Sequence, residues 1–270
     1  MTVLEWDQVG DKVYESGIDK GVLYLKDGRT VSWSGLTSIE DNTQTELKSY
    51  YLDGIKILDH VVPGDFEGKL AAFTYPEEFE EVLGAVAVET GITFYEQESK
   101  SFHLSYRTKI SNDLDENYGY KIHLLYNLRA TSEANTSESL GDQPAAKEFS
   151  WGLSGVPPVS TIDGVRPTVH VAIDSTKIDS ALLENIENIL YGTETTNPRF
   201  PSLLEIRILS GEVGGLYIVD NGNGTWTAID PSDDFIESVI DDEFIIDHAD
   251  VTYIVPDEEY TITDTPIPLP

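Results

Sequence analysis

Residues Trp33–Phe79 decide the fold of this chain, and they read WSGLTSIEDNTQTELKSYYLDGIKILDHVVPGDFEGKLAAFTYPEEF. They are followed by FHLSYRTKISNDLDENYGYKIHLLYN at Phe102–Asn127 and by FSW at Phe149–Trp151. In Phe102–Arg107, Phe, Leu and Tyr alternate with polar residues at a period of two, which is typical of a β-strand with one buried face. Thr37–Phe66, in contrast, lacks a strong apolar pattern. The stretch therefore predicts a β protein that contains one long segment outside its core.

Further strands are predicted on either side. Val22–Leu25, the turn Asp27-Gly28 and Thr30–Trp33 form a hairpin pattern. Tyr120–Tyr126 alternates again, and its pattern places Tyr120, Ile122, Leu124 and Tyr126 on one face. Thr168–Ile173 is another short strand candidate. Strand signals thus dominate the chain, and we expect a mainly β fold.

One segment has a helical pattern. Asp179–Gly192 carries five apolar residues at helical spacing, namely Leu182, Leu183, Ile186, Ile189 and Leu190. Asp179 or Ser180 can cap its amino end, and Gly192 can end it. We expect an amphipathic helix that flanks the β body. Pro76–Leu83 is a second candidate, for a turn or a single helical turn.

The composition changes near residue 205. From Glu205 to the end, sixteen residues are Asp or Glu and only Arg207 is basic. Apolar β-rich runs persist, at Leu216–Val219, Thr225–Ile229, Phe244–Ile246 and Val251–Ile254, so this segment is predicted to fold as a small acidic β appendage. We expect two domains, residues 1–204 and residues 205–270. Ala130–Lys147 and Thr263–Pro270 are predicted to be a solvent loop and a loose end.

Charge and composition limit the possible functions. The chain has 270 residues, no cysteine and a formal net charge of -32. Disulfides and thiolate sites are therefore excluded, and such a surface repels nucleic-acid phosphates and anionic membranes. No apolar run approaches the roughly 20 residues that cross a bilayer, and the start lacks the pattern of a signal peptide.

No motif predicts catalysis or metal binding. The histidines, His60, His103, His123, His170 and His248, are not in a paired metal-binding spacing. Asp113–Gly119 superficially resembles a calcium loop, but its glycine comes one place late and Leu124 stands where a bidentate Glu belongs. Neither a nucleophile elbow nor a phosphate loop is present. We expect no enzyme, no cofactor and no specific metal site.

The order of segments resembles that of the major tail tube proteins of long-tailed, siphovirus-type bacteriophages. The resemblance rests on Trp33–Leu36, Phe73–Phe79, Leu104–Thr108, Gly119–Leu124 and Ile189–Gly192. It implies a tail-tube β-sandwich or barrel with one flanking helix, in subunits that join into hexameric rings by their sheet edges. The rings stack through an extended loop, and Thr37–Phe66 is similar to that loop; this suggests Tyr50, Tyr51, Leu52, Asp53 and Lys56 as ring-stacking residues. Arg107, Lys109 and Lys121 are then expected to form charge pairs between subunits.

The resemblance implies a structural virion protein, located in the tail and assembled in the host cytoplasm. Its expected partners are copies of itself, the tail tape measure protein and the tail terminator or tip proteins. Double-stranded DNA would pass through the tube without specific binding, and an acidic wall suits such a conduit. The alternative is an extracellular or virion-surface β module that binds carbohydrate or acts as an adhesin.

Overall fold

The computed structural model describes residues 6–10, 12–133, 146–158 and 166–210, together with the backbone of five strands between residues 217 and 255; at Pro63 only the backbone is described. The chain forms two compact units. The first comprises residues 1–159 and 166–180, and the second comprises residues 160–165 and 181–270. The expected boundary between residues 204 and 205 was based on amino-acid composition, whereas these units are defined by contacts in space. The boundary therefore stays a prediction.

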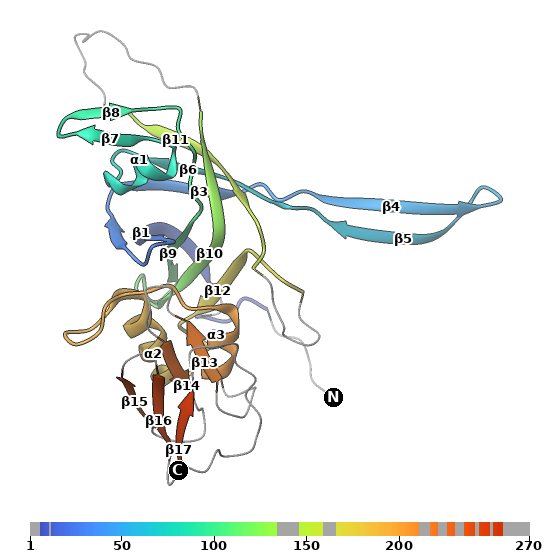
Figure 1. The fold of residues 1–270 in the computed structure, drawn as a ribbon. Coiled ribbons are helices and arrows are strands. Elements are labelled where there is room, and N and C mark those ends of the chain that lie inside the picture. Colours follow the sequence, from blue (N-terminus) through green and yellow to red (C-terminus); the bar gives the residue numbers. More distant parts are fainter. Residues whose placement is uncertain are drawn as a thin grey trace. The chain divides into compact units, whose positions relative to one another are not determined.

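The first unit is built almost wholly of strands (Figure 1). They are β1 (Tyr14–Leu25), β2 (Thr30–Trp33), β3 (Leu36–Asp41), β4 (Thr45–Leu52), β5 (Ile55–Pro63), β6 (Phe66–Ala72), β7 (Val86–Glu89), β8 (Ile92–Phe94), β9 (Phe102–Ser111), β10 (Gly119–Ser132), β11 (Phe149–Gly155) and β12 (His170–Asp174). A short helix, α1 (Glu78–Val82), interrupts them where one helical turn was predicted. The mainly β prediction is confirmed.

Eight of these strands form one antiparallel sheet in the order β2-β1-β9-β10-β11-β6-β3, with β12 also paired to β10. The sheet curls until β3 comes close to β1. At the closing point, a Cβ added to Gly21 would lie 2.3 Å from the Leu36 Cδ1 atom. A glycine is therefore needed there for the two strands to approach each other.

The curled sheet encloses an aromatic core. Trp33 and Phe79 pack with ring centroids 4.5 Å apart, and Trp151 lies 5.1 Å from Phe79. The indole nitrogen of Trp33 donates a hydrogen bond to the Thr74 carbonyl over 2.8 Å, so the one polar atom of this buried ring is satisfied. Leu23, Leu70, Phe102, Leu104 and Leu125 complete the centre of this core. The helix α1 contributes Phe79 and Val82, both fully buried, and this explains why a single helical turn is stable here.

Strand β10 changes the face that it presents to this core. The predicted face of Ile122, Leu124 and Tyr126 is buried, but the core cluster contains Leu125 from the opposite face. The pairing with β9 shifts between Leu125 and Leu128, where Asn127 has a φ of 46°. This bulge reverses the alternation, so Leu128 joins the same core as Leu125. A strict period of two along the sequence could not show the reversal.

Several local predictions can be checked directly. The hairpin β1–β2 is confirmed, with Leu23 opposite Val31 and Tyr24 opposite Thr30. The expected loop at Ala130–Lys147 was wrong at its start, because β10 continues through Ser132; residues 134–145 lie outside the described part.

The two longer helices are α2 (Ser180–Tyr191) and α3 (Leu203–Leu209). Apart from Ser180, the first residue of α2, they belong to the second unit. The predicted helix is confirmed as α2: Ile186 and Leu190 are buried, and Gly192 follows its end with a φ of 76°. Its place against the β body stays a prediction. The sequence reading missed α3, although Ser202 accepts a hydrogen bond from the Glu205 amide as its N-cap.

The acidic appendage has the predicted β character. The described backbone forms the hairpin of β13 (Tyr217–Asp220) and β14 (Trp226–Ile229) and a sheet of β15 (Phe235–Ile240), β16 (Glu243–His248) and β17 (Val251–Val255). Strand β15 was not predicted. The expected loose end at Thr263–Pro270 lies outside the described residues.

Candidate functional site: the β4–β5 arm

Strands β4 and β5 form a long two-stranded hairpin, which we call the arm, comprising residues 45–63 (Figure 1). Leu52 pairs with Ile55 across the two-residue turn Asp53-Gly54. Both turn residues have positive φ, 49° at Asp53 and 79° at Gly54. An Asp-Gly pair in this conformation gives the turn whose twist matches that of paired strands, so local sequence alone specifies the hairpin.

The arm exposes an unusual amount of apolar surface. Eight large apolar side chains on it are between 51% and 69% exposed; they are Leu47, Tyr50, Tyr51, Leu52, Ile55, Ile57, Leu58 and Val61. They occupy both faces of the ribbon, because the pair Leu47–Val61 and the pair Tyr50–Leu58 lie at positions of opposite parity. A two-stranded ribbon has no core of its own and is marginal in water. Exposed apolar surface of this extent is typical of an interaction site.

Polar contacts on the arm are local. Ser49 Oγ donates to Asp59 Oδ1 over 2.6 Å, and Lys56 Nζ lies 2.7 Å from Asp59 Oδ2. Lys56 and Ser49 together hold the pKa of the Asp59 carboxyl below its ordinary value. The charge of Lys56 is thus already balanced within the chain. The apolar side chains are therefore the main exposed feature of the arm.

The predicted stacking segment coincides with the tip of this arm. Tyr50, Tyr51 and Leu52 end β4, Asp53 forms the turn, and Lys56 lies in β5. The structure replaces the expected loop by regular strands, with a register shift between Tyr50 and Tyr51. Adjacent residues 50 and 51 are both more than half exposed. Their contact with a second ring stays a prediction.

The three predicted intersubunit cations lie on the sheet. Arg107 Nε donates to Asp19 Oδ1 over 2.9 Å, and its guanidinium carbon lies 4.3 Å from the centroid of the Tyr120 ring. Lys121 forms an ion pair with Glu15, whereas Lys109 is exposed on β9. These contacts lower the pKa values of Asp19 and Glu15. Arg107 and Lys121 therefore have partners within the chain, and a role between subunits stays a prediction.

Sequence reasoning missed a polar cluster on the same sheet. His123 Nδ1 lies 3.0 Å from His170 Nε2, and His123 Nε2 lies 3.0 Å from Thr108 Oγ1. The His123 ring stacks on Tyr106 with a centroid distance of 4.6 Å. Burial, aided by His170, lowers the pKa of His123 to about 4. Burial also lowers the pKa of His170, although Asp41, 3.7 Å away, opposes that shift.

The strand pairing brings these histidines together. Each lies in a predicted strand, but residues 123 and 170 are 47 positions apart, and only the pairing of β10 with β12 places them side by side. In the part of the chain that the structure describes, no group of three or more His, Asp or Glu residues is arranged to hold a metal ion. No helix among the described residues is long and apolar enough to cross a membrane.

No protein-family model and no curated protein matches the chain. One solved structure that resembles it is the extended state of the sheath-tube complex of an extracellular contractile injection system. The similarity covers 57% of this chain and 88% of that chain, with 12% sequence identity and a TM-score of 0.32. At that TM-score the likeness is too distant to assign a function.

Proposed function

We propose that this chain is a structural subunit of a viral tail tube. In this proposal six copies form a ring, and stacked rings make the conduit through which double-stranded DNA leaves a siphovirus-type virion. The sequence blocks at Phe73–Phe79, Leu104–Thr108 and Gly119–Leu124 support it through their resemblance to that family. The tape measure and the terminator or tip proteins would be the other partners, and assembly would take place in the host cytoplasm.

The single observation that carries the proposal is the arm. Its eight exposed apolar side chains would each gain about 1–2 kcal/mol on being covered, since burying a whole side chain of this size gains roughly 1.5–3 kcal/mol. Only the surplus over the cost of association appears as affinity. In a stack of rings, every arm would be covered by neighbouring subunits, and the gain would offset the cost of association at each ring. Neighbouring subunits could cover both faces of the arm, whereas a single flat partner would cover only one.

The charge of the chain supports the same proposal. A formal charge of -32 makes the surface repel duplex DNA, which carries a charge about every 1.7 Å. A conduit needs that repulsion at short range only, because salt screens it beyond roughly 8 Å. The absence of chemistry in the sequence motifs fits a structural role, and we propose that the chain is not an enzyme.

The test is assembly of purified protein, followed by light scattering and negative-stain electron microscopy across protein and salt concentration. The wild-type chain is expected to give hollow rings or tubes. The double variant Tyr51→Ser, Leu52→Ser removes two exposed apolar side chains from the arm tip and is expected to stop the stacking of rings.

The matched control is Leu114→Ser with Tyr118→Ser. These residues are also exposed, at 70% and 48%, but lie between β9 and β10, outside the arm. The control is expected to assemble like the wild type. A wild-type chain that remains monomeric under all conditions would refute the proposal. Equal loss of assembly in both double variants would refute the role of the arm.

A further inference from the structure

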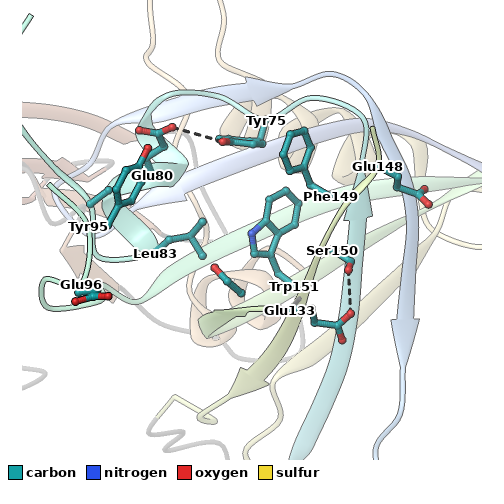
Figure 2. A pocket seen from close by; sticks show the side chains of 12 residues that line it. Tyr75, Glu80, Leu83, Tyr95, Glu96, Glu133, Glu148, Phe149, Ser150 and Trp151 are labelled. Atoms are coloured by element: carbon teal, nitrogen blue, oxygen red, sulfur yellow. Dashed lines mark hydrogen bonds between the residues drawn. The ribbon is translucent and has the colours of Figure 1, made fainter. Parts of the chain in front are cut away.

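A pocket opens beside the aromatic core in the first unit. It has a volume of about 480 Å³, which is within the range of small-molecule sites. Figure 2 shows Phe149 and Trp151 from β11 in its wall, with Tyr75, Leu83 and Tyr95 around them. The pocket is not part of the arm, and nothing in the proposed tube function requires it.

The aromatic wall is held rigidly. Tyr75 packs edge-on against Phe149 at 5.1 Å and against Trp151 at 5.4 Å, with interplanar angles of 89° and 88°. Trp151 is buried and anchored in the core, while Phe149 is only partly buried. The rings therefore hold one another in place, and a ligand would meet a preformed surface.

An ammonium group already lies over one of these rings. Lys147 Nζ is 5.2 Å from the centroid of Phe149. That distance is within the reach of a cation–π interaction, in which the negative face of the ring attracts the charge. The environment of Phe149 thus accepts an ammonium cation.

Four carboxylates line the same pocket, from Glu80, Glu96, Glu133 and Glu148. Glu133 is balanced by Lys69 at 2.7 Å, and it accepts a hydrogen bond from Ser150. Among the described residues, the other three glutamates form no salt bridge. Lys69 and Lys147 supply two positive charges beside these four carboxylates, and Glu148 also accepts a hydrogen bond from Thr37, so the pocket keeps a net negative charge beside aromatic rings.

We infer that this pocket binds a small organic ammonium cation of the polyamine type. The carboxylates attract the amines, and the rings and Leu83 contact the methylene segments between them. A neutral sugar could contact the rings and donate hydrogen bonds to the carboxylates, but it would leave their negative charge unbalanced. A hydrated divalent cation would use the carboxylates but gain nothing from the rings. The inference does not depend on the proposed function.

The test is titration of the full chain with spermidine in about 150 mM salt, followed by calorimetry and by the methyl resonances of Leu83 in leucine-labelled protein. Spermidine is expected to shift the Leu83 resonances saturably. Glu148→Gln and Phe149→Leu are each expected to weaken binding about two- to fivefold, as exposed charge pairs and cation–π contacts do. Glu67→Gln removes the same charge from an exposed site on β6 outside the pocket and is expected to change nothing.

Three outcomes would overturn the inference. One is equal weakening by Glu67→Gln and Glu148→Gln, which would show general counterion binding. Another is an equal Leu83 shift with magnesium at the same ionic strength. A third is saturable binding of a neutral disaccharide at the Leu83 resonances with no binding of spermidine, which would make the pocket a glycan site.

Discussion

The histidine cluster predicts that the chain loses stability in mild acid. The pKa of His123 is about 4 in the folded state and about 6.5 when the ring is free in water. The unfolded chain therefore takes up a proton near pH 6.5, whereas the folded chain does so only near pH 4. Protons favour the unfolded state in this window, so stability is intact above pH 6.5 and falls as the pH drops toward 4.

The size of the effect follows from the two pKa values. One pKa unit corresponds to about 1.4 kcal/mol, so at pH 4.5 His123 lowers the free energy of unfolding by about 2–3 kcal/mol relative to pH 7.5. The variant His123→Gln carries no titrating group and loses this part of the pH dependence. Its overall stability also changes, but that offset is the same at each pH.

Urea unfolding, followed by tryptophan fluorescence at four pH values from 7.5 to 4.5, measures the difference. The gap between the wild-type and His123→Gln free energies is expected to change by about 2–3 kcal/mol across the series. His60→Gln, on the exposed arm, serves as the control and is expected to track the wild type. Parallel wild-type and His123→Gln curves would refute the reasoning, because His123 would then titrate alike in both states.

Three more predictions follow from single contacts. Gly54→Val forces a branched residue into a positive φ, so we expect a loss of about 1–2 kcal/mol confined to the arm, measured as faster hydrogen exchange in β4 and β5 only. Arg107→Met leaves the partly buried Asp19 without its bidentate partner, and we expect the free energy of unfolding in urea to fall by about 1–3 kcal/mol. The control Lys109→Met, at an exposed position, is expected to leave the free energy of unfolding almost unchanged. Equal losses in the two variants would contradict a stabilising role of the Arg107–Asp19 pair. Burial lowers the pKa of the Lys26 amine, so we expect acetic anhydride at pH 7 to modify Lys26 faster than the arm lysines. Mass spectrometry of the peptides measures the rates, and slowest modification at Lys26 would contradict this prediction.

The sequence predicted elements whose causes are local. The Asp27-Gly28 turn, the alternation in β9 and the amphipathic stripe of α2 depend on neighbouring residues, and each appears in the structure. The expectation that all of Thr37–Phe66 lies outside the core was wrong at both ends, because β3 joins the main sheet and Phe66 is buried in the core. The arm between them was described as a loop, because its apolar residues lie on both faces and therefore show no core period. This placement of apolar residues on both faces masked the strands in the sequence, and it also explains why these side chains are exposed in the structure.

Features set by distant contacts could not be predicted. The bulge at Asn127 depends on how β10 pairs with β9, β11 and β12, and it moves Leu128 into the core with no signal in the residue types. His123 and His170 meet only through the pairing of β10 with β12. The pocket beside Phe149 joins residues from α1, β11 and the segment after β8, so its lining had no signature in any one stretch.

The two-residue turn of the arm fixes the pairing of its two strands, and this pairing restricts how the length of the arm can vary. Adding one residue to each strand would move every side chain between the two insertions to the opposite face of the ribbon. Adding two to each strand keeps the faces and extends the ribbon by about 7 Å, since each residue in a strand advances about 3.4 Å. If its two faces are to be kept, the length of the arm can therefore change only in steps of about 7 Å.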